Sequence, residues 1–392
     1  MGGAGSVARP PAPAAWGAGG DVLCVELRAA TGFPAAPPAG GGLPFVALRV
    51  GASDDAPVAA RWPHARRAET APVWRGWRPL GAPEGCAAIS VELFEGGARA
   101  TLDLVGADGA VAPGDVTVSV GGCALVFAAR VATAAPKWCF AVRHAESGWN
   151  RALATGDVVA LLGTIDHGLT RAGVAQARGL ADEIAAARCS AVAGSLERAF
   201  VDASTVLCSP LRRTVQTALV ALQGQGATLE LRSCLREVRG RGRDNAAAAL
   251  GDDVAARARA GLGADAPAAA HVAVDAGDAA QPWWSPGAEA AGSVARRVDD
   301  ALAAVAAEAG SPILVTHSNF LRRLFQLELD GGGDFAARKL ANCGVVAFRV
   351  DAAAPRGRRV SDATLLFGSA LAGDDASARR AAVLADVRDQ AG

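Results

Sequence analysis

Apolar and polar residues alternate through much of the first third of the chain. The alternation is regular in three segments, residues 21–28, 45–50 and 88–94. A period of two places successive side chains on opposite faces of a strand, so each segment is predicted to be a half-buried antiparallel strand. Turn-rich spacers separate these segments. The pattern therefore predicts an all-β sandwich over residues 21–131, preceded by a flexible leader rich in Gly, Ala and Pro over residues 1–20.

Beyond a predicted linker at residues 132–137, the pattern changes to short apolar runs that end in polar residues. Three such runs are 138–142, 206–208 and 313–315. In open α/β sheets, ligands bind beyond the carboxyl ends of the strands. The polar residues at the ends of these three runs include four candidate side chains, Arg143, His144, Arg213 and His317. If the three strands are parallel neighbours, these side chains converge on one spot of the size of an anion.

Three later segments have the features of helices. Residues 246–262 are rich in alanine, which favours a helix. Residues 293–306 carry apolar side chains at helical spacing, as expected for a core-facing helix. The last residues, 369–392, are predicted to form a helical tail. Together with the apolar runs, these segments predict an α/β domain at residues 138–368.

The ordered motifs of this second region resemble the histidine phosphatase superfamily, the phosphoglycerate mutase-like proteins. The signature of that family is Arg-His-Gly-Glu, followed later by a second Arg and a second His. The matching residues are, in chain order, Arg143 to Glu146, Asp166, Leu169, Thr170, Gly173, Ser209 to Thr217, Leu235 to Glu237, and His317. They span roughly residues 137–367, and the resemblance implies a three-layer α/β fold for this domain.

The resemblance implies a role for each of the principal side chains. His144 would be the nucleophile that forms a phosphohistidine, and Glu237 would protonate the leaving alcohol. Arg143, Arg213 and His317 would hold the phosphoryl oxygens. Phosphoryl transfer depends mainly on positioning and charge stabilisation, and guanidinium groups provide forked donors that match phosphate oxygens. The prediction is a phosphomonoester hydrolase that needs neither a metal nor another cofactor.

Further residues are predicted to contact a small phosphorylated substrate. Asn150 and Ser318 belong to the two histidine motifs. Trp283 and Trp284 either form an apolar wall for the leaving group or pin the preceding insert to the domain. Ala145 and Ser318 stand where the family usually has glycine, and their side chains are expected to narrow the pocket.

Other interpretations remain open beside this one. Arg213 could belong to an ordinary solvated helix face, and Glu237 to a salt-bridged loop. Among enzymes, the alternative is a phosphoglycerate-type mutase, which needs a pocket that retains the phosphorylated product. Among non-enzymes, the alternative is a catalytically weak, phosphate-sensing scaffold at a membrane, which Ala145 and Ser318 favour.

The first region resembles a C2 domain. The matching pieces are residues 29–34, 43–46, 70–74, 91–95 and 102–106. C2 domains often bind calcium through several aspartates, because a hard cation prefers an oxygen-rich cage. Here the loop at 35–42 has no carboxylate, and the later loop offers only Glu95 and Asp103. The resemblance therefore implies a calcium-independent targeting module that contacts a protein partner or a membrane.

Two features bear on a membrane partner. A basic and aromatic cluster at 61–67 is suited to anionic lipid headgroups, although a solvated strand is the favoured interpretation. The first six residues fit the pattern for N-myristoylation, with Gly2 and Ser6 at the required positions. One acyl chain anchors a protein only marginally, so stable attachment would require a second membrane-binding surface.

Composition limits the partners and the compartment. Lys plus Arg and Asp plus Glu number 39 each, and no long basic run occurs, so nucleic acid is not an expected partner. The eight cysteines lack Cys-x-x-Cys spacing and predict reduced, buried thiols rather than zinc ligands or disulfides. No apolar run reaches the ~18 residues of a membrane span, and the N-terminus lacks the pattern of a signal peptide. The expected location is the cytoplasm, with peripheral attachment to membranes as an alternative.

Overall fold

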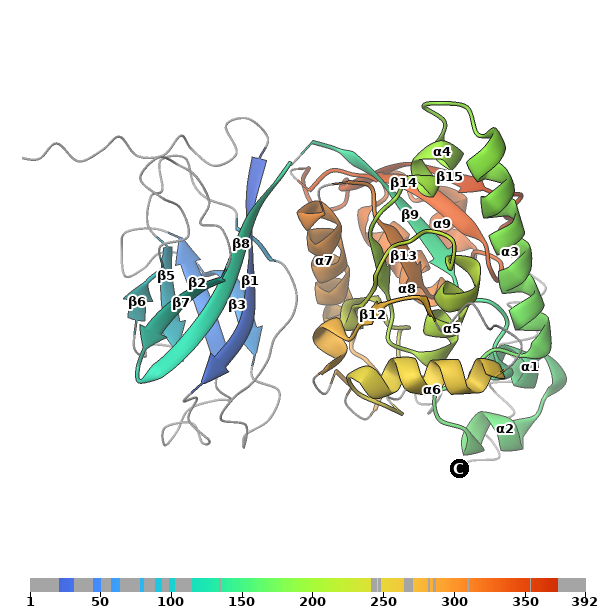
Figure 1. Ribbon diagram of the computed structural model, residues 1–392, viewed down its shortest axis with the longest axis horizontal. Helices are drawn as coiled ribbons and strands as arrows, with labels where there is room; N and C mark the ends of the chain where they lie inside the picture. The colour runs from blue at the N-terminus through green and yellow to red at the C-terminus, as the bar shows by residue number, and fades with distance from the viewer. Residues whose placement is uncertain are drawn as a thin grey trace, which may run out of the picture. The chain divides into compact units, whose positions relative to one another are not determined.

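The computed structural model divides into two compact units, residues 1–135 and 136–392 (Figure 1). It describes residues 21–31, 45–50, 58–63, 78–80, 89–93, 99–102, 115–133, 135–240, 245, 248–263, 271–280, 283–284, 287–308, 310–352 and 354–372. Five predicted features lie outside the described residues or their described side chains: the leader at 1–20, the loop at 35–42, the later loop with Glu95 and Asp103, the cluster at 61–67 and the tail beyond residue 372. These features stay predictions, as do the proposed domain boundaries.

The first unit contains two four-stranded sheets whose neighbouring strands are antiparallel. One sheet has the order β4 (Arg78–Leu80), β1 (Asp21–Thr31), β8 (Cys123–Thr133) and β7 (Asp115–Val120). The other has the order β3 (Val58–Pro63), β2 (Phe45–Val50), β5 (Ile89–Leu93) and β6 (Arg99–Thr101). The three segments predicted from alternation coincide with β1, β2 and β5, and alternate side chains such as Val25 and Leu27 are buried. The resemblance to a C2 domain stays a prediction.

The second unit is built on a seven-stranded sheet. Its order is β12 (Val274–Asp275), β11 (Leu229–Leu231), β10 (Val206–Cys208), β13 (Ile313–Thr316), β9 (Lys137–Arg143), β14 (Val345–Val350) and β15 (Val360–Leu366). The strands from β12 to β9 are parallel, whereas β14 and β15 are antiparallel to their neighbours. The three apolar runs predicted as strands are β9, β10 and β13. They are adjacent and parallel, as the convergence of their polar exits requires.

Side chains of the central strands alternate between two hydrophobic cores, one on each face of the sheet. In β9, Phe140 and Val142 belong to one core, and Cys139 and Ala141 belong to the other. The same alternation holds in β10, β13 and β14. Because both faces are covered, the middle residues of β9, β10 and β13 are apolar in succession rather than alternating in polarity.

Helices cover both faces of this sheet and complete the predicted three layers (Figure 1). The helices are α1 (Gly148–Thr155), α2 (Val158–Gly163), α3 (Arg171–Ser190), α4 (Leu196–Val201), α5 (Arg212–Ala221), η1 (Ser233–Leu235), α6 (Asp252–Leu262), η4 (Gly277–Ala280), α7 (Ala291–Ala307), α8 (Ser318–Glu328) and α9 (Gly333–Ala337). The core beside α3, α5 and α6 includes Val174, Val215 and Val254. The core beside α7 and α8 includes Val298 and Phe320.

The predicted helices differ from the observed ones at their ends. The alanine-rich segment becomes helical only at Asp252, because Gly251 adopts a left-handed conformation with φ of 58° and acts as the N-cap of α6. The described residues before it, 248–251, are not helical. The core-facing helix is slightly longer than predicted and spans Ala291–Ala307. Alanine content alone therefore placed the start of α6 too early.

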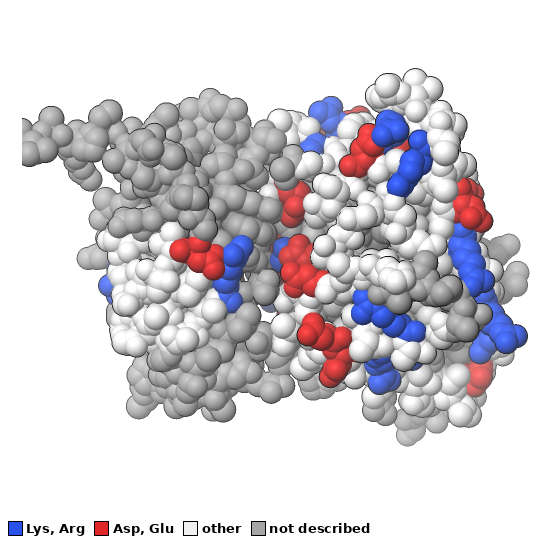
Figure 2. Space-filling view, in the orientation of Figure 1, with Lys and Arg blue, Asp and Glu red and all other residues white. Residues whose placement is uncertain are grey.

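The surface of the second unit carries charges of both signs. Figure 2 shows Lys and Arg interspersed with Asp and Glu over the described part of the visible face. Among the helices that the structure describes, none is long and apolar enough to span a bilayer. Cys123, Cys139, Cys208 and Cys234 are buried as predicted, whereas Cys189 is exposed.

Candidate active site

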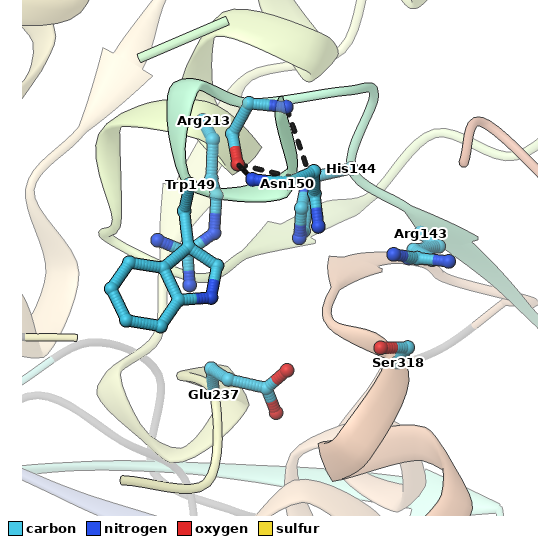
Figure 3. Close-up of a pocket in the computed structure, with 8 residues that line it drawn as sticks. Arg143, His144, Trp149, Asn150, Arg213, Glu237 and Ser318 are labelled. Atoms are coloured by element: carbon cyan, nitrogen blue, oxygen red, sulfur yellow. Dashed lines mark hydrogen bonds between the residues drawn. The ribbon is translucent and has the colours of Figure 1, made fainter. Parts of the chain in front are cut away.

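A pocket lies at the carboxyl end of the parallel strands (Figure 3). Its lining consists of Arg143, His144, Ser147, Trp149, Asn150, Arg213, Glu237 and Ser318. The hollow has a volume of roughly 270 Å³ when the open solvent at its mouth is included. Four strands supply these residues through the segments that follow them: β9, β10, β11 and β13. Three of the four residues predicted to converge, Arg143, His144 and Arg213, therefore line one pocket.

The register of the strands aligns the carboxyl ends of β9, β10, β11 and β13. Val315 of β13 pairs with Val142 of β9 on one side and with Cys208 of β10 on the other. Cys208 in turn pairs with Leu231 of β11. Each strand ends within a few residues of this row, so the polar side chains that follow emerge at the same edge of the sheet.

His144 is held so that one ring nitrogen is fixed. Its Nδ1 lies 2.7 Å from the carbonyl oxygen of Ala145, which can only accept, so Nδ1 carries the proton and Nε2 of the neutral ring keeps its lone pair. The backbone N–H of His144 donates to Thr316 at 3.0 Å. Its carbonyl accepts from the side-chain amide of Asn342, also at 3.0 Å. The ring is buried, and the backbone contact thus distinguishes its two nitrogens.

The Ala145 side chain faces the hydrophobic core rather than the pocket. Ala145 is fully buried, belongs to the core on the α3 side of the sheet and is not a lining residue. Its backbone N–H donates to the Thr217 hydroxyl at 3.0 Å. Its φ is not in the left-handed region, so the position does not require glycine. The expectation that the Ala145 methyl narrows the pocket is therefore not met, whereas Ser318 does line it.

The two pocket arginines are buried and anchored at one end. A guanidinium nitrogen of Arg143 donates to the Leu340 carbonyl at 2.5 Å. A guanidinium nitrogen of Arg213 donates to the side-chain oxygen of Asn245 at 2.6 Å. Arg213 is only 2% exposed, so it is not part of a solvated helix face. Both cations are fixed at the wall of the pocket (Figure 3).

The carboxylate of Glu237 lies at the N-terminus of α8. One oxygen accepts from the backbone N–H groups of Val238 at 2.8 Å and Phe320 at 3.0 Å. The other accepts from the backbone N–H and side-chain amide of Asn319 at 3.3 and 3.1 Å. None of the ion pairs found in the described part of the chain involves Glu237. The group is thus positioned by amide donors rather than by a salt bridge.

His317 lies behind the pocket and is completely buried. Its ring centroid is 5.0 Å from that of His144, and its Nε2 lies 2.8 Å from the Ser209 hydroxyl oxygen. Burial lowers the pKa of His317 well below its usual value, and the positive charges of Arg213 and neighbouring groups act in the same direction. The ring is therefore neutral. Among the described residues, its Nδ1 has no hydrogen-bond partner.

Four residues were predicted to contact the substrate, and two of them line the pocket. Asn150 and Ser318 are lining residues, although the Asn150 side chain also closes a capping box with Ser147 at the start of α1. Trp283 packs against the hydrophobic core, and the Trp284 ring lies 5.9 Å from the Arg239 guanidinium. Neither tryptophan lines this pocket. Trp283 thus occupies the position expected of a residue that pins the insert.

The sequence motifs did not single out Trp149 as a site residue. Its indole projects into the pocket between Arg213 and Glu237 (Figure 3). The indole Nε1 is buried and has no hydrogen-bond partner among the described residues. Trp149 lies between Ser147 and Asn150, the two residues of the capping box of α1, and its position within the first turn was the sequence signal for a role in the pocket.

The electrostatic character of the pocket favours an anion. Two guanidiniums face a single carboxylate in its lining. In addition, the lining residues include members of the first turns of α1, α5 and α8, whose N-terminal ends carry partial positive charge. Among the described residues, no group of three metal-binding side chains occurs.

The loop that carries His144 rests on the N-terminus of α3. The backbone N–H of Thr170 donates to the Glu146 carbonyl at 3.0 Å, and the Thr170 hydroxyl bonds the Glu146 carboxylate at 2.5 Å. A Cβ on Gly173 would lie 2.0 Å from the same carbonyl oxygen. The Gly173→Ala variant is expected to lose roughly 1–3 kcal/mol of unfolding free energy, because backbone must shift to accommodate the methyl. Urea denaturation measures this loss.

The matched control for this variant is Gly179→Ala in the same helix. A Cβ on Gly179 meets nothing within 4 Å, so alanine is expected to be neutral or to stabilise the protein by about 1 kcal/mol. Equal unfolding free energies for the two variants would show that the approach of Gly173 to Glu146 is not tight in solution.

Asp166 is expected to make stability fall with rising pH. It is buried, and burial raises its pKa from 3.8 to about 6, although Arg213 and the N–H of Arg212 oppose the shift. Between these values the folded state binds the proton more tightly than the unfolded state, so unfolding free energy declines as pH rises from about 4 to about 6. Between about pH 4 and about pH 6, the unfolding free energy of the wild type should therefore fall by up to ~3 kcal/mol relative to that of the Asp166→Asn variant.

The comparison with Asp166→Asn is needed because the neighbouring His167 changes the pH dependence of stability in the opposite direction. Burial, together with Arg213, lowers the pKa of His167 from 6.5 to about 4, so its contribution to stability grows as pH rises through the same window. Asparagine keeps the acceptor for the Arg212 N–H, which lies 2.8 Å from the Asp166 side chain. Urea denaturation of both proteins from pH 4 to pH 7 gives the difference, and parallel curves would refute the prediction.

Comparison with known proteins gives a family match. The family model described as the histidine phosphatase superfamily, branch 1, matches residues 139–363. A comparison with the curated proteins finds no match.

Solved structures also resemble the chain. Mycobacterial hydrolase 1 has 19% sequence identity and a TM-score of 0.36, with 60% of this chain and 100% of that protein covered. A mycobacterial glucosyl-3-phosphoglycerate phosphatase in complex with VO3 has 18% identity and a TM-score of 0.33, with 54% and 92% covered. A putative alpha-ribazole-5'-P phosphatase from Escherichia coli has 16% identity and a TM-score of 0.33, with 60% and 96% covered.

The family match agrees with the motifs and with the fold of the second unit. It begins within β9 and ends within β15, so it contains every residue that lines the pocket. Because the match covers more than half of the 392 residues, the chain belongs to the histidine phosphatase superfamily and is a phosphatase.

Proposed function

We propose that the protein hydrolyses a small phosphomonoester through a phosphohistidine on His144, without a metal. The observation that carries the proposal is the 2.7 Å hydrogen bond from His144 Nδ1 to the Ala145 carbonyl, which leaves the lone pair on Nε2. Arg143 and Arg213 lie in the same pocket lining. A fixed nucleophile and two forked cations are the groups that phosphoryl transfer requires.

In the first step, Nε2 of His144 attacks phosphorus while the bond from phosphorus to the leaving oxygen breaks. Glu237 gives its proton to that oxygen, so that a neutral alcohol departs. Glu237 is the carboxyl group in the pocket lining and therefore the side chain placed to transfer a proton to the leaving oxygen. Arg143 and Arg213 stabilise the charge on the three equatorial oxygens.

His317 supplies a further donor in this scheme. The backbone N–H of Leu211 points to the Ser209 oxygen at 3.4 Å, so the Ser209 hydroxyl proton is available for Nε2 of His317. The neutral His317 ring then carries its proton on Nδ1, the atom without a partner among the described residues. This N–H would donate to a phosphoryl oxygen on His144.

In the second step, water attacks the phosphohistidine. The bond between Nε2 of His144 and phosphorus breaks, inorganic phosphate forms and the carboxylate of Glu237 takes the proton of the water. Both groups are then ready for another substrate. This use of one carboxyl as acid and then as base follows from the reversal of charge flow between the two steps.

The test is phosphate release from a panel of phosphomonoesters in the presence of EDTA. Turnover that survives chelation, together with a phosphorylated peptide that contains His144 after rapid acid-free quenching, supports the proposal. Conversion of 3-phosphoglycerate to 2-phosphoglycerate without net phosphate release would instead identify a mutase. Binding of inorganic phosphate without turnover of any ester would support the sensing scaffold.

For residues 21–131, the proposal is a calcium-independent C2-like targeting module. Its support is limited to the sequence pieces that resemble a C2 domain and to the antiparallel strands of the first unit. A membrane or protein partner and a cytoplasmic location follow from that resemblance and from composition alone.

A further inference from the structure

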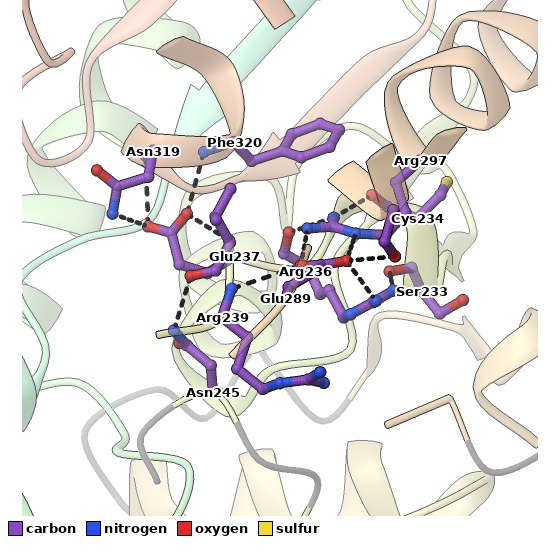
Figure 4. A network of polar contacts seen from close by, with 12 residues as sticks. Ser233, Cys234, Arg236, Glu237, Arg239, Asn245, Glu289, Arg297, Asn319 and Phe320 are labelled. Carbon is purple, nitrogen blue, oxygen red and sulfur yellow. Dashed lines mark hydrogen bonds and ion pairs between the residues drawn. The ribbon is translucent and has the colours of Figure 1, made fainter. Parts of the chain in front are cut away.

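A buried ion cluster lies beside Glu237 and outside the pocket lining (Figure 4). Its centre is Glu289, whose side chain is 1% exposed. The Glu289 carboxylate accepts from Arg236 at 2.8 Å and from two nitrogens of Arg297 at 2.8 and 2.7 Å. The Ser293 hydroxyl adds a contact at 3.2 Å. The proposed mechanism uses none of these four side chains.

The cluster is bonded to the backbone on both sides of Glu237. Arg297 donates to the carbonyls of Cys234 at 2.8 Å and Arg236 at 2.7 Å. On the other side, the backbone N–H of Glu289 donates to the Arg239 carbonyl at 3.0 Å. The backbone N–H of Arg239 returns a contact to the Glu289 carboxylate at 3.4 Å. Residues 234–239 are thus clamped at both ends.

The cluster also reaches Glu237 through α8. The Arg297 guanidinium lies 5.1 Å from the centroid of the Phe320 ring. The backbone N–H of Phe320 is one of the donors to the Glu237 carboxylate, at 3.0 Å. One side chain, Arg297, therefore contacts both the segment that bears Glu237 and a residue that holds its carboxyl group.

The charge state of the cluster supports a permanent structural role. Burial alone would raise the pKa of Glu289, but the hydrogen bonds and positive charges of Arg297 and Arg236 outweigh it and lower the pKa to about 2. Burial lowers the pKa of Arg236 to about 10, and the charge of Arg297 adds to this shift. Glu289 and Arg236 are therefore both charged across the pH range in which an enzyme works.

We propose that Glu289 is a positioning residue for Glu237, acting through Arg297 and Arg236. It fixes the backbone of residues 234–239, so that the Glu237 carboxyl meets the leaving oxygen of the substrate. The inference rests on the proposed role of Glu237 as proton donor. It assigns no contact between Glu289 and the substrate, since Glu289 does not line the pocket.

Dependence on the leaving group separates positioning from a general effect on stability. An alkoxide is a poor leaving group and needs a proton from the enzyme, whereas p-nitrophenolate leaves readily without one. A displaced Glu237 should therefore slow the hydrolysis of alkyl phosphates and leave p-nitrophenyl phosphate largely unaffected. Loss of folded protein would lower both rates by the same factor.

The experiment compares kcat/KM for β-glycerophosphate and p-nitrophenyl phosphate in the full chain and its Glu289→Gln variant. Glutamine keeps the shape of the side chain and removes the charge that orients two arginines. We expect kcat/KM for the alkyl ester to fall at least tenfold more than that for the aryl ester. An equal fall for both esters, or no fall, overturns the positioning role.

The matched control is Glu328→Gln. Glu328 is also fully buried and accepts from Arg359 and from the backbone N–H of Gly357, but it does not contact residues 234–239. The ratio of the two kcat/KM values should stay at that of the wild type. A selective loss in this control as large as that in Glu289→Gln would also overturn the proposal.

Two further variants distinguish failure of the positioning role of Glu289 from failure of the proton-donor role of Glu237 and from misfolding. Glu237→Gln must itself show the selective loss, and if it lowers both rates equally, the proton-donor role fails whatever Glu289 does. If Glu289→Gln does not fold, as judged by circular dichroism, Arg297→Lys takes its place. Lysine keeps a cation beside Glu289, but its single nitrogen cannot hold both carboxylate oxygens of Glu289 as the fork of Arg297 does and also reach the Cys234 and Arg236 carbonyls. The same selective loss is expected, and equal losses again contradict the proposal.

Discussion

Replacing His144 with alanine should lower kcat for phosphomonoester hydrolysis by roughly three orders of magnitude or more. Alanine removes the imidazole of His144 from the pocket lining and leaves the two arginines in place. Without Nε2, water would have to attack the ester directly, and no phosphoenzyme could accumulate. Steady-state phosphate release measures the first effect, and mass spectrometry after a rapid quench measures the second.

Phosphate binding provides the internal control for this variant. Because Arg143 and Arg213 remain, the affinity for inorganic phosphate should change by less than about tenfold, since most of the charge that holds an anion is intact. His271→Ala, at an exposed position that does not line the pocket, should leave kcat unchanged. If His144→Ala kept a tenth of the wild-type kcat, the phosphohistidine mechanism would be wrong.

The second unit could be predicted from sequence because its strands are short, apolar and followed directly by polar residues. The alternation of Phe140 and Val142 with Cys139 and Ala141 between two cores explains why β9 is apolar from residue 138 to residue 142. Such a run predicts burial on both faces, and hence helices on both sides. The site then follows from topology, since adjacent parallel strands place Arg143 and Arg213 at one edge of the sheet.

Side-chain direction was harder to predict than position. A comparison of Ala145 with the glycine of the family suggested a narrower pocket, but the methyl belongs to the core. Trp149 is one residue before the predicted Asn150, yet its indole rather than the amide fills the gap between Arg213 and Glu237. Such differences depend on how the first turn of α1 is oriented, and no pattern of residue types encodes that orientation.

The cluster around Glu289 could not be found from sequence at all. Arg236 is next to Glu237 in the chain, but Glu289 is separated from Arg236 by more than 50 positions, and Arg297 lies further along still. In the sequence, a glutamate that is buried between two arginines cannot be distinguished from one in a solvated surface ion pair, because the residue types are the same. Only the burial of Glu289 and the backbone carbonyls that Arg297 bonds distinguish the two cases.

Arg213→Ala is expected to lower kcat/KM by roughly 10²- to 10³-fold, which is the scale of losing one cation that stabilises a phosphoryl transition state. Arg213 is buried at the wall of the pocket and is oriented by Asn245, so no water-exposed group can take its place readily. Arg213→Lys should recover only part of the loss, because an ammonium keeps the charge but not the fork. Phosphate release at substrate concentrations below KM measures both variants.

Arg212→Ala provides a comparison at the neighbouring position of the same helix. The Arg212 side chain does not line the pocket, and it lies against α6, where a Cβ on Gly261 would overlap it. This variant should lose stability rather than kcat/KM per folded molecule, since Arg212 contacts no part of the proposed phosphate site. A loss of kcat/KM of less than fivefold in Arg213→Ala, with phosphate affinity unchanged, would mean that the phosphoryl group is held by Arg143 and the helix N-termini alone.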